Sequence, residues 1–264
     1  MRGLKAILTA AGDAKRALDY EEDILVLISI MDVNIPKFTQ NDIPLFKSIT
    51  SDLFPGVVLP EREYTHLLNA IKEACVDNNW QAEQDFLDKC IQLYDTIMVR
   101  HGLMVVGEST CGKTVIIESL KMAMSKLHGT NGMTKVSTNK INPKSIRSHQ
   151  LYGVFDMDTK QWTDGVLPRI MRELSANGEI AQREWIIFDG PVDAVWIENM
   201  NTVLDDNKKL CLTSGEIIKL TRWMTIMFEV EDLQHASPAT VSRCGMVFLE
   251  AKNLAWKSIV KSYF

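Results

Sequence analysis

Several features that mark other classes of protein are missing from the 264 residues of this chain. No stretch approaches the ~20 consecutive apolar residues that a membrane-spanning helix needs, so we do not expect an integral membrane protein. The net charge of −5 leaves no basic excess of the kind that a DNA- or RNA-binding groove requires. The sequence therefore predicts neither a membrane nor a nucleic acid as a partner.

Paired cysteines and an export signal are missing as well. The five cysteines are an odd number and contain no C-x-x-C pair, which suits free thiols in a reducing cytosol better than disulfides or zinc. The N-terminus resembles a signal peptide only faintly, because Lys5 interrupts its apolar part and charged residues follow at once. An apolar content of 46% allows a sizeable core. We expect a globular protein that is not exported.

The most informative stretch that is present covers residues 102–114 and reads GLMVVGESTCGKT. Its apolar residues 103–106 predict a strand buried on both faces, and the apolar spacing after Lys113 predicts a helix. Residues 107–114 match the P-loop pattern G-x-x-x-x-G-K-[ST] between them. A chance match in an unrelated turn is the alternative, and the strand before it and the helix after it argue against that.

A P-loop curls backbone N–H groups around phosphate oxygens at a helix N-terminus, where unpaired donors and the helix dipole favour an anion. The predicted nucleotide-binding residues of the loop are Gly107, Glu108, Ser109, Thr110, Cys111, Gly112, Lys113 and Thr114. Lys113 is expected on the outer phosphates and Thr114 on Mg²⁺. Glu108 is unfavourable beside phosphate unless it points outward. Cys111 is interpreted as a spacer residue.

Two further apolar runs end in acids. Residues 185–188 are followed by Asp189, which is the Walker B pattern, and Asp189 is expected to hold the Mg²⁺ through water. A strand that merely ends in a polar residue at a turn is the alternative. Residues 224–228 are followed by Glu229. Its carboxylate would face phosphate charge, which is unfavourable unless Mg²⁺ or an arginine compensates.

The residue after Asp189 is Gly190, where many P-loop ATPases of the AAA+ class carry a glutamate that activates the attacking water. Loss of a positioned base costs about 10² to 10⁴ in rate. The site is therefore expected to hold nucleotide far better than it cleaves it. Asp193 and Glu198, in the following loop, are the candidates to substitute, although neither is at a strand terminus.

The predicted fold is an α/β three-layer αβα sandwich with a mainly parallel sheet and a small helical region before it. Residues 103–106, 185–188 and 224–228 are its predicted central strands. The other predicted elements are a strand at 135–141, a hairpin or loop excursion at 156–165 and a hairpin at 210–220. Helices are predicted from 65 to the break at 78–79, at 80–99, from 143 toward 151, at 166–176 and after Ser237, followed by a strand at 245–249. Residues 1–31 are predicted to be mostly helical, and the proline-punctuated residues 36–60 to be a connector that apolar side chains anchor to a core.

Other short motifs accompany these patterns: LTAAG, PKF, DIPLF, DLFPG, QLYDTIMVRHGLMVVG, INPKSI, LYG, WTDG, WIIFDGPVD, NTVLDDNKKL and ATVSRCGM. Together they resemble the second AAA+ module of a dynein heavy chain of the axonemal type. The resemblance implies that residues 1–60 are the end of the helical lid of the preceding module, with Arg2 as that lid's nucleotide-sensing arginine. It implies that residues 61–101 are linking helices, 102–250 the large subdomain and 251–264 the start of a truncated lid.

The resemblance also implies a function. The cofactors are ATP or ADP with Mg²⁺, held with little or no hydrolysis, and Arg243 is an arginine finger for the nucleotide of the preceding module. On spacing alone, Arg243 is a helix-end arginine paired with carbonyls or an acid. The implied partners are the neighbouring AAA+ modules of the same heavy chain. Intermediate chains, light chains and microtubules would be reached only through the full-length motor, in the axoneme of a cilium or flagellum.

Two other readings stay open from the sequence. One is a free-standing P-loop ATPase or kinase, which would need a base near Asp189 and a complete lid. Its GTP-specific form lacks the guanine-reading aspartate in the near-match at residues 139–142. The other is a truncated, non-functional dynein fragment that folds poorly and binds nothing, which a test of monomer dispersity would distinguish.

Overall fold

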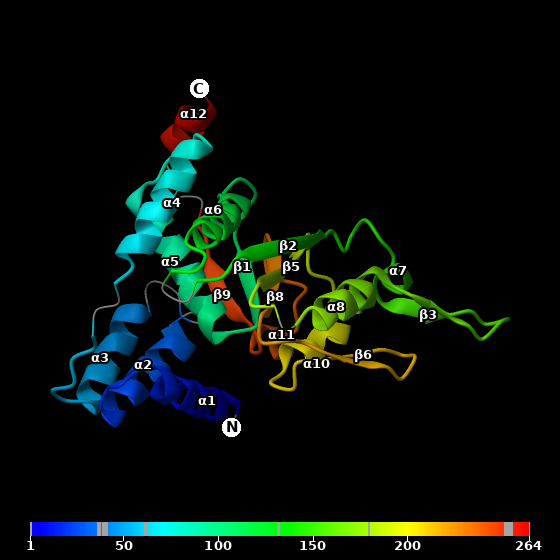
Figure 1. Ribbon diagram of the computed structural model, residues 1–264, viewed down its shortest axis with the longest axis horizontal. Helices are drawn as coiled ribbons and strands as arrows, with labels where there is room; N and C mark the ends of the chain where they lie inside the picture. The colour runs from blue at the N-terminus through cyan, green and yellow to red at the C-terminus, as the bar shows by residue number, and fades with distance from the viewer. Residues whose placement is uncertain are drawn as a thin grey trace. The chain divides into compact units, whose positions relative to one another are not determined.

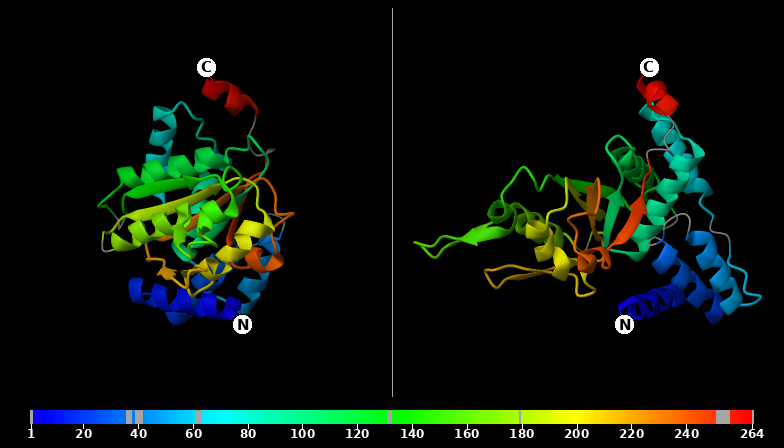
Figure 2. Two further views of the ribbon diagram at one scale, coloured as in Figure 1. Left: turned by 90° about the vertical axis from the view of Figure 1, so that its right-hand side faces the viewer. Right: turned by 180° about the vertical axis from the view of Figure 1, so that it is seen from behind.

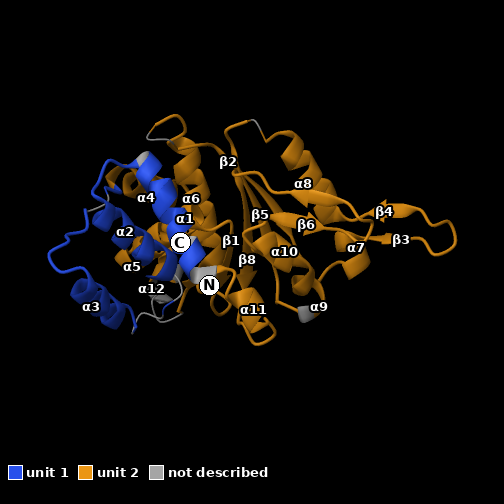
Figure 3. Ribbon diagram, turned by 90° about the horizontal axis from the view of Figure 1, so that it is seen from below, with its two compact units in different colours: residues 1–64 blue, residues 65–264 orange. Residues whose placement is uncertain are grey.

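A computed structural model of the chain describes residues 2–35, 38, 42–60, 63–130, 133–178, 180–250 and 256–263. The chain divides into two compact units, residues 1–64 and residues 65–264 (Figure 3). Among the described residues, none of the helices combines the length and the apolar character needed to cross a bilayer. All five cysteines are free thiols.

The first unit is helical. It contains α1 (Arg2–Ala17), α2 (Glu22–Asn34) and α3 (Ile43–Leu53), and α1 lies against α2 (Figure 1). The residues predicted to be a connector contain a helix, α3, which was not predicted; Pro44 stands in its first turn, where a missing N–H costs no hydrogen bond. The expected anchoring is wrong for three α3 side chains, since Leu45, Ile49 and Leu53 are exposed. Pro36 and the side chain of Arg2 lie outside the described part of the chain.

The second unit is built on a five-stranded sheet in the order β2-β5-β8-β1-β9, and every pair in it is parallel. The strands are β1 (Gly102–Val106), β2 (Val136–Ile141), β5 (Arg183–Asp189), β8 (Met224–Val230) and β9 (Gly245–Phe248). The three predicted central strands are β1, β5 and β8, and they do lie side by side in the middle of the sheet. The α/β prediction is confirmed.

Helices cover both faces of this sheet, which gives three layers (Figure 2). On one face, α5 (Gln84–Val99) contacts β1 and β9, α6 (Lys113–Lys126) contacts β2, and α4 (Thr65–Asp77) packs on α6. On the other face, one hydrophobic cluster joins Met104 and Phe188 of the sheet to a second group of helices. These are α7 (Ser148–Tyr152), α8 (Val166–Ala176), α9 (Ala194–Ile197), the 3-10 helix η2 (Glu198–Met200) and α10 (Asn201–Leu204).

Two hairpins and two short helices complete the described part of this unit. The hairpins are β3 (Gly153–Phe155) with β4 (Trp162–Asp164) and β6 (Lys209–Cys211) with β7 (Ile217–Lys219), both close to prediction. The helices are α11 (Pro238–Val241), capped by Ser237 as expected, and α12 (Trp256–Tyr263). Two predicted helix starts are wrong, because residues 143–147 form a turn before α7 and residues 80–83 are not helical. Asn79, at φ +55°, turns the chain away from the direction of α4.

The buried aromatic rings of Phe188, Trp196 and Phe228 stack on one another in the cluster described above, at centroid distances of 5.3 to 5.9 Å. We predict that Phe228→Ala lowers the free energy of unfolding by about 3–5 kcal/mol, because it leaves a cavity between β5 and α9 that the sheet cannot close. Urea denaturation measures the loss. Met157→Ala is the control, since Met157 is 91% exposed, and an equal loss in both variants would contradict the prediction.

His101 precedes β1, and its Nε2 donates to the Val203 carbonyl at 2.9 Å. Burial, with the nearby Lys208, lowers the pKa of His101 to about 4 from 6.5. Below pH 6.5 the unfolded chain therefore takes up a proton that the folded chain does not, so stability falls as the pH is lowered toward 4. We predict a loss on the order of 2 kcal/mol between pH 7 and pH 5 that His101→Gln removes. Identical pH profiles of unfolding for the two proteins would contradict it.

Candidate nucleotide-binding site

The P-loop leaves β1 at Gly107 and enters α6 at Lys113, and its two glycines are required by the backbone. Gly112 has φ +86°, which residues with side chains adopt only with strain. A Cβ at Gly107 would lie 2.4 Å from the Leu249 carbonyl oxygen and 2.6 Å from Cys111 Sγ. The two glycines therefore allow the loop to turn tightly between β1 and α6.

The side chains of the loop divide into an inner and an outer group. Lys113 Nζ turns back over the loop and donates to the carbonyl oxygens of Gly107 at 2.6 Å and Glu108 at 2.8 Å. Cys111 is buried, and burial raises the pKa of its thiol, which fits a packed spacer rather than a reactive group. The side chains of Glu108, Ser109 and Thr110 are exposed, so the charge of Glu108 is in solvent.

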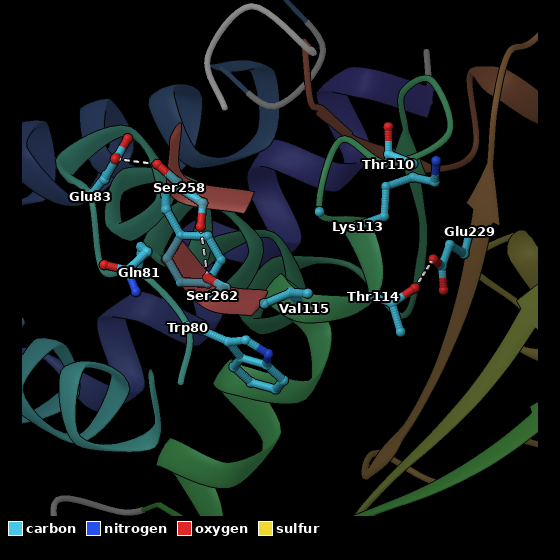
Figure 4. Close-up of a pocket in the computed structure, with 12 residues that line it drawn as sticks. Trp80, Gln81, Glu83, Thr110, Lys113, Thr114, Val115, Glu229, Ser258 and Ser262 are labelled. Atoms are coloured by element: carbon cyan, nitrogen blue, oxygen red, sulfur yellow. Dashed lines mark hydrogen bonds between the residues drawn. The ribbon is translucent and has the colours of Figure 1, made fainter. Parts of the chain in front are cut away.

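The polar ends of the neighbouring strands meet the loop at one edge of the sheet. Asp189 of β5 is paired in register with Glu229 of β8, and Glu229 with Val105 of β1. Thr114, in the first turn of α6, donates its hydroxyl hydrogen to Glu229 Oε1 (Figure 4). Thr114, Asp189 and Glu229 were predicted from separate motifs, and the parallel sheet brings them together.

A lysine that the sequence analysis did not assign to the site joins the two acids. Lys140, near the end of β2, places Nζ 3.0 Å from Asp189 Oδ2 and 3.6 Å from Glu229 Oε2. Burial alone would lower the pKa of Lys140, but its pairing with Asp189 and Glu229 outweighs that and raises it. The ammonium is therefore held charged between the two carboxylates.

The chemistry of these donors fits Mg²⁺. The Thr114 hydroxyl and the Asp189 and Glu229 carboxylates are hard oxygen ligands, the kind that Mg²⁺ prefers. Glu229 is only 7% exposed, and its Oε2 has no hydrogen-bond partner within the described structure. Since the described residues contain no cluster of three or more metal-ligating His, Cys, Asp or Glu side chains, water and phosphate oxygens would complete the coordination, as is usual for Mg²⁺.

A pocket of about 380 Å³ opens beside the loop, and its size lies in the range of small-molecule sites. Thr110, Lys113, Thr114 and Glu229 line its polar end, while Trp80, Phe86 and Val115 supply apolar surface (Figure 4). Trp80 and Phe86 come from the connector before α5 and from α5 itself. Sequence reasoning missed both, because it placed Trp80 inside a helix and Phe86 on the packed face of that helix.

Residues of α12 close another side of the same pocket. Ser258 donates its hydroxyl hydrogen to Glu83, and Asn79 Nδ2 donates to the Ser262 carbonyl at 3.0 Å. The helix is therefore tied to the α4–α5 connector that carries Trp80. No motif marked these serines, since the contact joins segments about 180 residues apart in the sequence.

The two loop acids proposed as substitutes for the missing base are placed differently. Asp193 Oδ1 accepts a hydrogen bond from the Val195 N–H at 2.9 Å, so this carboxylate caps the turn into α9. Glu198 lies in η2 with an exposed side chain. Neither lines the pocket beside the P-loop.

Arg243 lies at the opposite edge of the sheet from the P-loop. It precedes β9, whose Gly245 pairs with Leu103 at the start of β1, so the length of β1, roughly 16 Å, separates it from the loop. Its Nε donates to Asp205 Oδ1 at 2.6 Å and its Nη1 to the Ala239 carbonyl at 2.7 Å. The side chain is 12% exposed. Arg243, unlike the loop residues, Asp189 and Glu229, is therefore not brought to the phosphate edge.

A phosphate loop between a central parallel strand and a helix, with an acid at the end of a neighbouring strand, defines a P-loop nucleotide-binding fold. Comparison with protein families agrees with this geometry. Residues 102–244 match "AAA domain (dynein-related subfamily)", and residues 1–114 match "hydrolytic ATP binding site of dynein motor region". The chain belongs to the dynein-related family of AAA domains.

Curated relatives share about half of their aligned residues with this chain. Dynein axonemal heavy chain 12 of Homo sapiens is 50% identical over 266 residues, and dynein axonemal heavy chain 3 of Mus musculus is 51% identical over 266. Dynein axonemal heavy chain 1 of Rattus norvegicus is 51% identical over 269 residues. Each alignment covers 100% of this chain but only 9%, 6% and 6% of the respective relative.

The contacts of Arg243 generate a stability prediction. Arg243→Met leaves the Asp205 carboxylate without its partner, and we expect it to lower the free energy of unfolding by about 1.5–3 kcal/mol, the range for a hydrogen bond to a charged group. Urea denaturation measures this. Arg16→Met is the matched control, because Arg16 pairs with Asp13 on an exposed surface, where ion pairs contribute little. Equal stability of wild type and Arg243→Met would show that the pair contributes nothing to the fold.

Proposed function

We propose that this chain is a nucleotide-holding AAA+ module, which binds ATP or ADP with Mg²⁺ at the P-loop and hydrolyses ATP slowly or not at all. One observation carries the proposal. The P-loop, Asp189 and Glu229 meet at one edge of the sheet beside a pocket, while the position after Asp189, where a base would be needed, is Gly190.

The loop, the metal-holding residues and the apolar wall of the pocket have separate roles in binding. The N–H groups of the loop and the start of α6 face the phosphates, and Lys113 carries the positive charge for the outer ones. Thr114 and Asp189 would hold Mg²⁺, whose charge would offset that of the phosphates. Trp80, Phe86 and Val115 provide apolar surface for the base at the other end of the pocket.

Weak hydrolysis is expected because Gly190 supplies no catalytic base and Asp193 is poorly placed to replace one. Without a side chain at this position, no group at the end of β5 takes the proton of an attacking water. Asp193 is engaged with the Val195 N–H, so it is poorly placed to substitute. The expected cost of a missing base, about 10² to 10⁴ in rate, makes this a site for holding nucleotide.

The position of Arg243 supports a role toward a neighbouring module. An arginine about one strand length from its own P-loop cannot neutralise its own nucleotide, whereas the edge it occupies can face the phosphates of the preceding module. Such a finger is worth about 10³ or more in kcat. Since Arg243 is paired with Asp205 here, acting on a neighbour requires it to leave or share that carboxylate.

The relatives suggest the setting. We propose that the chain works as part of a dynein heavy chain in the axoneme of a cilium or flagellum, with the neighbouring AAA+ modules as its direct partners. Intermediate chains, light chains and microtubules would be reached only through the full-length motor. In this arrangement residues 1–60 belong to the lid of the preceding module, residues 61–101 link the modules, and residues 251–264 begin the module's own lid.

The proposal is tested by titration calorimetry of the 264-residue chain with Mg-ATP and Mg-ADP, together with a phosphate-release assay. We predict that Lys113→Ala weakens nucleotide binding about 10- to 100-fold, because one ammonium–phosphate interaction is lost. Lys126→Ala is the control, since Lys126 lies in the last turn of the same helix and pairs with Glu73 in solvent. It should leave binding unchanged.

Three outcomes would count against the proposal. Equal affinities of Lys113→Ala and Lys126→Ala would place the nucleotide elsewhere. Rapid phosphate release by the wild type would mean that another residue serves as the base. A well-folded, monodisperse wild type that binds neither nucleotide would mean that these 264 residues are not sufficient to hold one.

A further inference from the structure

Lys140 is the charged residue of the phosphate edge to which the proposed binding mechanism gives no role. It lies in register with Ile187 of β5, one residue before the end of β2. Its ammonium contacts Asp189 at 3.0 Å and lies 3.6 Å from Glu229 Oε2. The surrounding residues 139–142 resemble a guanine-reading motif only in part, so that pattern does not account for the lysine.

Glu229 is the group that makes a cation necessary at this place. Its carboxylate is 7% exposed, and a buried charge is costly unless it is paired. It also stands in register with Asp189 on the adjacent strand, about 4.8 Å away along the hydrogen-bonding direction, so two like charges lie side by side. Lys140 is within ion-pair distance of both.

The two oxygens of Glu229 have different partners. Oε1 accepts the hydroxyl hydrogen of Thr114, and Oε2 faces the Lys140 ammonium. The carboxylate is thereby held in one orientation, with its negative charge partly neutralised. Thr114 is also the residue that would hold Mg²⁺ on the outer phosphates of a bound nucleotide. Because Thr114 contacts Glu229, a third phosphate would come close to Glu229, whereas the first two would lie within the loop.

We propose that Lys140 determines whether the site accepts a nucleoside triphosphate, because its ammonium neutralises the Glu229 carboxylate that would otherwise repel the third phosphate. A diphosphate does not extend to the end of β8 and needs no such compensation. The proposal rests on the nucleotide binding proposed above. It makes Lys140 a specificity-determining residue and explains how a carboxylate can stand at the end of β8.

The test compares the affinities of variants of the 264-residue chain for Mg-ATP and Mg-ADP at one fixed ionic strength. We expect Lys140→Met to weaken Mg-ATP binding about tenfold or more and Mg-ADP binding by less than about threefold. Lys140→Arg keeps the charge and should stay within about threefold of wild type for both. In a Glu229→Gln background, Lys140→Met should have little effect on Mg-ATP, since the repelling charge is gone.

Lys135→Met is the matched control. Lys135 immediately precedes β2 at the opposite end of the strand, so its loss changes the net charge equally without touching the site. Equal weakening of Mg-ATP and Mg-ADP by Lys140→Met, or the same weakening in the Glu229→Gln background, would overturn the inference while leaving nucleotide binding intact. Failure of the wild type to bind any nucleotide would instead overturn the proposed function and this inference with it.

A readout without nucleotide checks the pairing itself. Thermal unfolding of the four proteins of the Lys140→Met and Glu229→Gln cycle should give a non-additive Tm, with Lys140→Met destabilising the wild type more than the Glu229→Gln variant. Additive Tm changes would contradict the pairing of Lys140 with Glu229. Lys140→Arg should retain the wild-type Tm, which separates loss of charge from damage to the end of β2.

Discussion

A buried carboxylate beside a second acid at the end of a parallel sheet is the constraint on which the site depends. The parallel pairing of β5 with β8 fixes Asp189 beside Glu229. Burial removes most of the water that would screen Glu229, which is 7% exposed, whereas the Asp189 side chain is 42% exposed. Two neighbouring groups compensate for these charges, namely the Thr114 hydroxyl of α6 and the Lys140 ammonium of β2. Loop, strands and helix are thereby joined through one polar network, so that phosphate binding at the loop and the orientation of Glu229 are expected to depend on each other.

The same sheet separates the two proposed functions in space. The carboxyl ends of the strands gather the phosphate loop and the acids, and the amino ends carry Arg243 and its partner Asp205. The proposed finger therefore stands away from this module's own nucleotide site. This fits a chain whose relatives are far longer proteins, of which it aligns with 9% or less. On this account the module holds its own nucleotide and offers its opposite edge to a neighbour.

The elements that depend only on short, local sequence patterns were predictable from the sequence. The central strands are uninterrupted apolar runs, and the P-loop and Asp189 follow them directly, so these patterns alone were enough to infer the parallel sheet and its phosphate edge. Helix α3 was not predicted, because the sequence alone does not distinguish a proline in the first turn of a helix, as Pro44 is, from a proline that ends one. Trp80 and Ser258 could not be assigned to the pocket, since the contacts that place them there join distant segments. Lys140 was missed for the same reason, because its partners lie on strands 49 and 89 residues further along the chain.

The central claim is that the site holds a nucleoside triphosphate without cleaving it, and the chemical state of bound nucleotide tests this most directly. The protein is mixed with less than one equivalent of radiolabelled Mg-ATP, freed of unbound label and quenched in acid at intervals, and the labelled ATP and ADP are then separated. The account predicts that the bound label remains ATP for many minutes. Conversion to ADP within seconds, as a typical kcat of about 1–10³ s⁻¹ would give, would contradict it.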